Sequence, residues 1–351
     1  MQSDWHDFLD NRGAEFNNGI VEHYGNPAQE LSVVLTGNVI CDLSHYGLLA
    51  ISGDDTTSFL QTQFINDVSK LEVSSSQLNG YCNPKGRLIA NFRVFWRHDT
   101  LYLRFPLDLL EEVSKVLNKY KLRSKVTLED HSDSMVRIGY SGATADKTLA
   151  TILPQLPEAA DDVIQIDNLT VIKIPGITPS YELYGDTGII TDIWTKLDVH
   201  GAPVGMSAWQ LIEILAGMPH ITDESSEEYV PQMVNYQAIN GLSFTKGCYP
   251  GQEIVARMHY LGKLKKRMYL ARVRSDTAPY VQQELVSGTS KGSSKTGNIL
   301  NTAPHPDGDY AVLAVIQISD AESEKIYLES KDGPVLEILD LPYKVELKQE
   351  K

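Results

Sequence analysis

The chain has 351 residues, of which 42% are hydrophobic and 22% are charged, and its formal net charge is −15 at pH 7. The length predicts two or three domains, and no apolar run approaches the ~20 residues that are needed to cross a bilayer. The negative charge argues against broad nucleic-acid binding, which depends on many Lys and Arg side chains near the phosphates.

The N-terminal sequence has neither the basic nor the apolar region of a signal peptide, so we expect a cytoplasmic protein. The three cysteines, Cys41, Cys82 and Cys248, lie far apart, which argues against a disulfide framework and fits a reducing compartment. No Cys or His spacing indicates a metal site. Three thiols are also fewer than the four that usually hold an iron–sulfur cluster, so a cluster would need a second chain or a small-molecule ligand.

The first part of the chain predicts an extension followed by an α+β unit. Residues 1–30 are polar and irregular, and we expect an extension or a loosely packed helix there. The first α+β unit is predicted over 31–134. It begins with a strand from Cys41, and a helix follows Asp54 and carries an apolar stripe as far as Val68.

A β-meander is predicted next, with its first turn at Asn83-Pro84-Lys85-Gly86, where Gly and Pro set the backbone dihedrals. A helix is predicted after Pro106. A second α+β unit is predicted over 135–263, with short strands and two helices, the second of which runs from about Ser207 to Ala216. Short strands separated by turn residues predict a small antiparallel barrel over 264–351. The pattern indicates an α+β fold rather than a doubly wound one.

The densest functional signal is the segment Lys246–Glu253, KGCYPGQE. Gly247 and Gly251 permit a positive φ and close backbone approach, so the loop can point Cys248 outward while Glu253 begins the next element. Neighbouring Lys246 and Arg257 would favour the thiolate form of the cysteine. The alternative is that Cys248 is a small buried hydrophobe, as many free cysteines are.

A basic segment follows this loop. From Ile254 to Ser275 there is no Asp or Glu, and the segment contains seven Lys and Arg residues. It can receive an anion such as a folate glutamate tail, a phosphate or a short RNA contact. A solvated strand surface would have the same composition.

The pattern K-G-C-Y-x-G-Q-E is the signature of the YgfZ family, which is related to the T-protein aminomethyltransferases of the glycine cleavage system. The chain resembles this family over most of its length and in the family's order. The other matching segments are LQTQFINDVS, CNPKGRL, KYKLRSKVTL, SAWQLIEILAGMP, YVPQMVN and the closing LPY.

The resemblance implies an aminomethyltransferase-like folate-binding fold, made of two α+β units and a small C-terminal antiparallel β-barrel. It implies tetrahydrofolate or a derivative as the ligand. It also implies a role in the assembly or repair of iron–sulfur clusters, with iron–sulfur proteins or their assembly factors as partners. The link to tRNA modification would be indirect, through a cluster enzyme, and no membrane partner is implied.

The resemblance also implies site residues. Tyr46 and Trp209 fall on aromatic positions that are associated with folate in the family, and ordinary packing is the alternative for both. Arg257 is the expected cation for the ligand's tail. Cys248 is the expected reactive thiol, and Lys246, Gly247, Tyr249, Gly251, Gln252 and Glu253 complete the motif around it.

Two departures from the T-protein pattern concern carboxylates. Leu215 stands where T-protein relatives place a glutamate that bonds the pterin edge. Glu213 is two residues earlier, about 200° around a helix, and should not substitute for it. Ala90 and Asn91 stand where the aminomethyltransferases carry an acid, and an amide cannot accept a proton as a carboxylate does. We therefore expect no glycine-cleavage activity.

Two other functions remain open from the sequence. A one-carbon transferase with an unidentified acceptor would need a general acid or base, for which Glu253 and Asp67 are candidates, although a structural hydrogen-bond acceptor is the simpler interpretation of each. Direct tRNA binding through the basic residues of 257–274 would show steep salt dependence, and the net charge of −15 argues against it.

Overall fold

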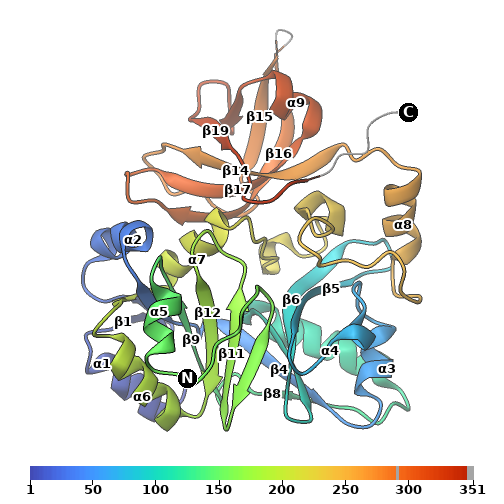
Figure 1. The fold of residues 1–351 in the computed structure, drawn as a ribbon. Helices are drawn as coiled ribbons and strands as arrows, with labels where there is room; N and C mark the ends of the chain where they lie inside the picture. The colour runs from blue at the N-terminus through green and yellow to red at the C-terminus, as the bar shows by residue number, and fades with distance from the viewer. Residues whose placement is uncertain (290–291, 346–351) are drawn as a thin grey trace. The chain divides into compact units, whose positions relative to one another are not determined.

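The protein is described by a computed structural model that covers residues 1–289 and 292–345 (Figure 1). The chain divides into two compact units. The first unit contains Met1–Phe59, Lys70–Gln77 and Arg93–Ile212, and the second contains the remaining segments, including the C-terminal barrel. The division differs from the predicted boundaries, because residues of 1–30 and of both predicted α+β units share the first unit.

A six-stranded sheet forms part of the first unit. Its strand order is β10-β11-β12-β9-β3-β13, and every pair is antiparallel except β13 with β3. The strands are β3 (Val39–Asp42), β9 (Val136–Ser141), β10 (Val163–Ile166), β11 (Leu169–Ile174), β12 (Ser180–Gly185) and β13 (Ala202–Val204). The mixture of one parallel and four antiparallel pairs agrees with the predicted α+β class.

Helices α1 (Ser3–Asp10), α5 (Ala145–Ala150) and α6 (Thr187–Leu197) cover one face of this sheet. Alternate strand residues such as Ile138 and Tyr140 point into the core beneath them, together with Trp194 of α6. The alternating residues Arg137 and Gly139 of the same strand face the other side. That other face carries part of the candidate site.

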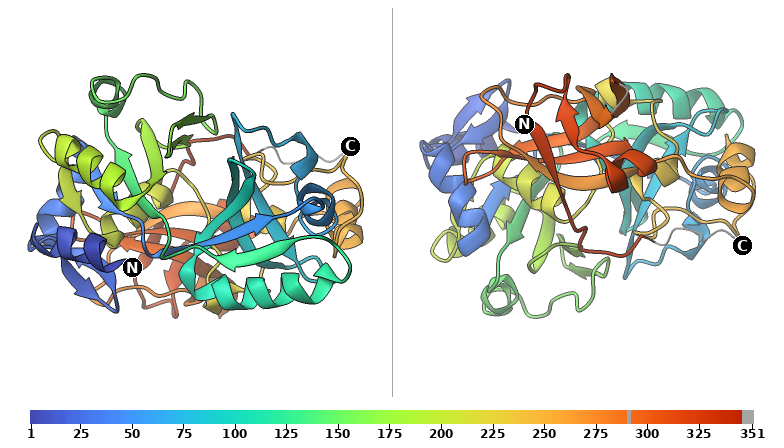
Figure 2. Two further views of the ribbon diagram at one scale, coloured as in Figure 1. Left: turned by 90° about the horizontal axis from the view of Figure 1, so that it is seen from below. Right: turned by 90° about the horizontal axis from the view of Figure 1, so that it is seen from above.

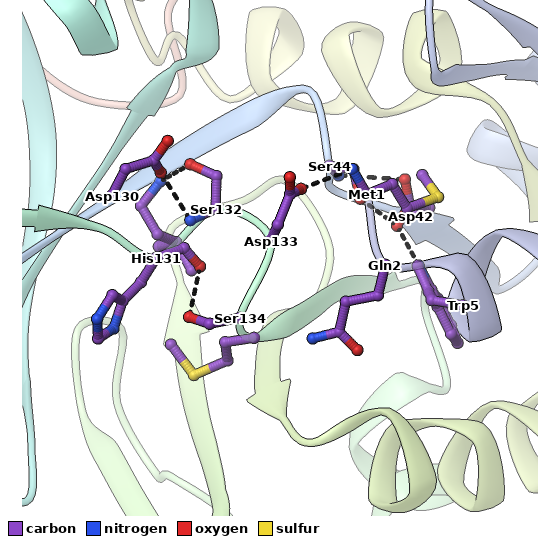
Figure 3. Close-up of polar contacts among 12 residues, drawn as sticks. Met1, Gln2, Trp5, Asp42, Ser44, Asp130, His131, Ser132, Asp133 and Ser134 are labelled. Carbon is purple, nitrogen blue, oxygen red and sulfur yellow. Dashed lines mark hydrogen bonds and ion pairs between the residues drawn. The ribbon is translucent and has the colours of Figure 1, made fainter.

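The N-terminal residues differ most from the prediction, because they are part of this core rather than a loose extension. Trp5 and Leu9 are buried, and the indole Nε1 of Trp5 donates to Asp42 Oδ1 at 2.8 Å. The amino group of Met1 contacts Asp133 at 2.6 Å (Figure 3). The sequence prediction failed because the few apolar residues of this segment are spaced to pack on a distant strand. Between α1 and β3 lie β1 (Glu15–Asn17), β2 (Ile20–His23) and α2 (Pro27–Thr36).

A five-stranded sheet has the order β5-β6-β7-β4-β8. Its strands are β4 (Tyr46–Ser52), β5 (Ser76–Cys82), β6 (Leu88–Arg97), β7 (Thr100–Pro106) and β8 (Thr127–Asp130). The predicted meander is confirmed as β5-β6-β7, and the predicted helix after Pro106 is α4 (Leu110–Lys121), which follows a short 3-10 turn. Strands β5 and β6 each pass from one unit into the other along the chain.

Two smaller predictions in this region were wrong. The strand predicted from Cys41 is two strands, β3 and β4, which belong to different sheets. The chain turns between them because Arg137 donates to the carbonyls of Leu43, Ser44 and Tyr46. The helix predicted to reach Val68 is the short α3 (Thr56–Gln61), followed by a 3-10 turn.

The C-terminal segment forms a closed barrel with the order β14-β17-β16-β15-β18-β19, and all of its pairs are antiparallel (Figure 2). Its elements are β14 (Lys266–Val273), β15 (Glu284–Thr289), β16 (Gly292–Pro304), β17 (Tyr310–Gln317), α9 (Ile318–Ser323), β18 (Ile326–Leu328) and β19 (Val335–Leu339). The predicted antiparallel barrel is confirmed. Within the predicted segment 264–351, residues 290–291 and 346–351 lie outside the described residues.

Over residues 1–289 and 292–345, no helix is long and apolar enough to cross a membrane. In the same residues, no three His, Cys, Asp or Glu side chains are grouped so that they could hold a metal ion.

The position of Trp5 generates a prediction about stability. We expect Trp5→Ala to lower the free energy of unfolding by about 3–5 kcal/mol, because it removes a large buried side chain and leaves a cavity. Urea unfolding measures the change, with Asp10→Ala at the exposed end of α1 as the control. A loss no larger than that of the control would contradict the assignment of α1 to the core.

Candidate functional site

The predicted loop that begins at Lys246 and carries Cys248, which we call the thiol loop, lies in the second unit. It leads directly into α8 (Gln252–Tyr260). Gly251 is the N-cap of this helix, with φ of +79°, a left-handed conformation that glycine adopts without strain. Cys248 is exposed, whereas Cys41 and Cys82 are buried. The buried-hydrophobe alternative therefore describes those two cysteines and not Cys248.

Two glycines bring the thiol loop against the turn between β5 and β6. A Cβ added at Gly251 would lie 2.5 Å from both the carbonyl oxygen of Asn83 and the Cα of Gly86. Gly86 also has a positive φ, and a Cβ there would lie 3.1 Å from the carbonyl oxygen of Gly251. The two backbones touch, so the sequence pieces NPKG and KGCYPGQE form one structural feature.

Lys246 anchors the start of the loop from inside the protein. Its side chain is buried, and Nζ donates to the carbonyl oxygens of Phe64 and, at 3.0 Å, of Asn66. Burial lowers the pKa of Lys246 to about 8, and the nearby Asp67 carboxylate opposes that shift. The ammonium therefore donates to backbone carbonyls, and its effect on the charge of the thiol stays a prediction.

The segment that receives Lys246 is itself fixed by side-chain amides. Asn66 Nδ2 donates to the carbonyl oxygens of Leu78 at 2.9 Å and Asn240 at 2.7 Å, and its backbone N–H donates to Asn79 Oδ1 at 2.8 Å. Asp67 Oδ1 accepts hydrogen bonds from Gln61 and Ser69. Asp67 is thus a structural acceptor, as the simpler interpretation of the sequence supposed.

The remaining residues of the motif divide into buried and exposed positions. Tyr249 is buried, with its ring 5.4 Å from Lys246 Nζ, and burial, with a smaller contribution from the Cys82 thiol, raises the pKa of its hydroxyl. Gln252 is half-buried in the first turn of α8, and Glu253 is exposed there. Arg257 is exposed and, in the part of the chain that the structure describes, forms no ion pair.

The two predicted folate residues lie in the first unit and are both buried. Trp209 is on α7 (Met206–Leu215), and its ring covers Gly139 of β9, where an added Cβ would be only 2.3 Å from the ring. Glu182 stands directly opposite Gly139 in the β12–β9 pair. Directly opposed residues project from the same face, so the Glu182 side chain and the Trp209 ring share one face of the sheet.

Tyr46 is connected to that face through a buried ion pair. The guanidinium of Arg104 lies 4.2 Å from the centre of the Tyr46 ring and pairs with Glu182. The hydroxyl of Tyr184 also donates to Glu182, and burial followed by this carboxylate raises its pKa well above the ordinary value. Removing one partner of a buried pair costs about 3–5 kcal/mol, so this ion pair holds Arg104 against the Tyr46 ring.

A polar atom of Trp209 on this face has no hydrogen-bond partner among the described residues. The indole Nε1 of Trp209 is buried and, within the described residues, makes no hydrogen bond. A buried donor without an acceptor costs about 1–3 kcal/mol. A ligand that brings an acceptor to this atom would recover that free energy, which fits the polar edge of a pterin.

The two positions at which this chain lacks a carboxylate of the T-protein relatives lie in the second unit. Asn91 is buried, its Nδ2 donates to the carbonyl oxygen of Pro219 at 2.7 Å, and its Oδ1 accepts from the N–H of Ile221 at 2.8 Å. The amide thus fills a structural role that requires both a donor and an acceptor. Glu213 is buried and pairs with His220 Nε2 at 3.2 Å, while Leu215 is half-buried.

The predicted site residues therefore fall into two groups, one in each unit. Tyr46 and Trp209 belong to the first, and the motif residues with Arg257 belong to the second. The sequence analysis missed Arg104, which contacts the Tyr46 ring, and its partner Glu182, which lies on the same sheet face as Trp209. The signal that could have found them is a single charge inside an otherwise apolar strand, as in LYLRFP and SYELYG.

Comparisons with known proteins find relatives over most of the chain. Residues 11–242 match the family model described as the GCVT N-terminal domain. The chain is 32% identical over 305 residues to the tRNA-modifying protein YgfZ of Colwellia psychrerythraea, a match that covers 87% of this chain and 93% of the relative. It is 31% identical over 304 residues to the protein of the same name from Yersinia pestis strain Pestoides F, covering 87% and 92%.

A solved structure shows the same fold. The glycine cleavage system aminomethyltransferase T from Bartonella henselae superposes with a TM-score of 0.79 over 97% of each chain, at 14% sequence identity. The predicted aminomethyltransferase-like fold, with its C-terminal barrel, is confirmed.

The burial of the cysteines predicts selective labelling. We expect a thiol reagent such as iodoacetamide to modify Cys248 in the folded protein and to leave Cys41 and Cys82 intact, because a buried thiol is shielded from the reagent. Peptide mass spectrometry measures the sites, and unfolding in urea should expose all three. Modification of Cys82 as fast as Cys248 under native conditions would contradict the packing beneath the loop.

The buried lysine predicts a pH dependence. Because the pKa of Lys246 falls to about 8 in the folded state, from an ordinary value of 10.5, the unfolded chain binds the proton more tightly. Loss of the Lys246 proton therefore favours the folded state. The free energy of unfolding gains nothing from this group below about pH 8 and rises as the pH increases from about 8 toward 10.5. We expect Lys246→Met to lack that gain when urea unfolding is compared across this range, with the exposed Lys85→Met as the control. Parallel curves for the wild type and Lys246→Met would contradict the assignment.

Proposed function

This chain belongs to the YgfZ family, and from that premise we propose that it is a folate-binding accessory protein that supports tRNA modification through the assembly or repair of iron–sulfur proteins. The observation that carries the proposal is the exposed Cys248 on a loop fixed by Lys246 and Gly251. A free thiol that is both accessible and rigidly held suits reversible contact with a cluster, a persulfide or a client protein.

We propose that the folate pterin is held in the first unit, by Tyr46 and Trp209. A flat pterin needs aromatic walls and a few polar atoms at its edge. The unpaired Nε1–H of Trp209 supports this proposal, because it offers a buried donor to a ring nitrogen or carbonyl. Leu215 cannot supply the carboxylate of T-protein relatives, and Glu182 is already bonded by Arg104 and Tyr184.

The glutamate tail of folate carries carboxylates, and the sequence resemblance implies Arg257, in the second unit, as a cation for such a group; this stays a prediction. The guanidinium is exposed and unpaired among residues 1–289 and 292–345, so it is available to an anion. In this proposal the bound folate acts either as the carrier of a one-carbon unit or through its reduced pterin ring. This chain would bind and orient the folate.

The link to tRNA is proposed to be indirect. The relatives carry the name tRNA-modifying protein, but a chain with a net charge of −15 is repelled by a polyanion. Several cations of the basic segment are also occupied within the protein. Arg272 pairs with Asp307 and Asp309, and Arg267 lies over the ring of Tyr269.

Transfer of a one-carbon unit is the second candidate, since the fold is that of an aminomethyltransferase. It has less support. Asn91, at the position expected for the acid, is held by two backbone groups, and Asp67 is held by Gln61 and Ser69. Glu253 is exposed in the first turn of a helix, where a carboxylate is favoured by the helix dipole.

Calorimetric titration with tetrahydrofolate tests the folate proposal. We expect saturable binding by the wild type and about tenfold weaker binding by Trp209→Phe, which keeps a ring but removes the Nε1–H donor. Cys248→Ser should bind as the wild type does, because the thiol is not proposed as a folate contact. Absence of binding at millimolar tetrahydrofolate would contradict the proposal, and equal binding by Trp209→Phe would remove Trp209 Nε1 from it.

A further inference from the structure

Helix α8, which follows the thiol loop, exposes an apolar stripe. Ile254 and the half-buried Met258 lie four residues apart on one face of the helix, and Leu261 follows as its C-cap residue. Ile254 is 39% exposed and Leu261 is 85% exposed. Exposed apolar residues that lie singly need no explanation, but a continuous stripe on one helix marks an interaction surface.

The same helix is anchored through a different face, so the stripe is not needed for folding. Val255 is buried, and its carbonyl oxygen accepts a hydrogen bond from Gln232 Nε2 at 2.7 Å. His259, one turn later, stacks on Phe244 with ring centres 3.6 Å apart. The buried pair and the exposed stripe are separated by roughly 100° around the helix.

Two cations accompany the stripe: Arg257 is on α8 itself, one turn after the exposed Glu253, and Lys265 follows four residues after Leu261. Arg257 and Lys265 are exposed and form no ion pair within the part of the chain that is described. The run from Ile254 to Ser275 contains no acidic residue, although the whole chain has a net charge of −15. A local excess of cations on an acidic protein favours an acidic partner at this surface and repels it elsewhere.

The stripe lies next to the thiol loop in the second unit. Ile254 is in the first turn of α8, four residues after Pro250 of the thiol loop. The Cβ of Ile254 lies 3.1 Å from the position of a Cβ built on Gly86. Figure 1 shows α8 outside the barrel strands, and both views of Figure 2 agree. Cys248 is only four residues before the first residue of α8, so a partner seated along α8 would be close to it.

We propose that the surface formed by Ile254, Arg257, Met258, Leu261 and Lys265, which we call the α8 ridge, docks a protein partner that presents an apolar groove bordered by carboxylates. The ridge would seat the partner so that its reactive group faces Cys248. This inference deepens the proposed function and rests on it, because it supplies the docking contact for the client of the thiol.

The chemistry of the ridge favours a protein over the other occupants. Aliphatic side chains such as Ile254 and Leu261 need an apolar pocket, and a nucleic acid offers phosphates and base faces instead. A second copy of this chain would bring carboxylates, but a head-to-tail contact of that kind does not close into a dimer. An acidic protein with an apolar groove satisfies both the stripe and the cations.

Site-specific photocrosslinking tests the proposal in the full-length chain. Benzoylphenylalanine would be placed at position 261 and, as the control, at Val199, which is 77% exposed in the first unit. We expect an adduct with an acidic protein from 261 and none from 199. The combination of Arg257→Glu with Lys265→Glu should abolish the adduct, because like charges then face the partner.

Binding of the purified partner, identified by mass spectrometry of the adduct, completes the test. We expect Leu261→Asp and Arg257→Glu each to weaken binding by about tenfold or more, and a carboxylate-to-Arg change in the partner to restore binding to Arg257→Glu. Leu122→Asp, at a comparably exposed leucine of the first unit, is the matched control and should bind as the wild type does.

Three outcomes would overturn the proposal. An adduct between two copies of the chain would assign the ridge to self-association, and salt-dependent tRNA binding that is lost in Leu261→Asp would assign it to RNA. Equal adducts at 261 and 199, or none at 261, would remove the ridge as a docking surface. Leu261→Asp should still bind tetrahydrofolate and be alkylated at Cys248 as the wild type is. If it does while the docking predictions fail, the docking role of the ridge is wrong and the proposed function is unaffected.

Discussion

The thiol loop depends on one buried cation. Lys246 places its ammonium on the carbonyl oxygens of Phe64 and Asn66, and this contact holds the start of the loop to a segment far away in the sequence. The lowered pKa of Lys246 shows what burial costs the charged form. The ammonium contacts and the close approach of Gly251 to Gly86 hold the backbone of the loop in place. Cys248 is exposed on this fixed backbone.

The first unit uses the same physical device for a different purpose. Arg104 and Glu182 are a buried ion pair, and they connect the ring of Tyr46 to the sheet face on which Trp209 lies. In each unit a buried charge with specific partners holds the groups around it in place. Hydrophobic packing alone would allow more alternative positions for the same groups. The Nε1 of Trp209 is one of several buried polar atoms without a partner among the described residues, and we interpret it as a contact that a ligand could use.

Much of this could be predicted from local sequence. The barrel strands, the meander and the exposed thiol loop follow from alternation, turn residues and the glycines of KGCYPGQE. The role of Trp5 and the split of the predicted strand at Cys41 could not be predicted, because both depend on partners distant in sequence. The direction of the Lys246 side chain was missed for the same reason, since local spacing cannot show which carbonyls a lysine will reach.

The central claim is that Cys248 is the functional thiol and that its loop exists to present it. The most direct measurement is tRNA modification in a bacterium that lacks its own relative and expresses this chain with Cys248→Ser. The account predicts normal protein abundance with no restoration of the modification, whereas Thr245→Ser directly before the loop and Cys82→Ala beneath it should both restore it. Full restoration by Cys248→Ser would contradict the account and leave the loop a structural role.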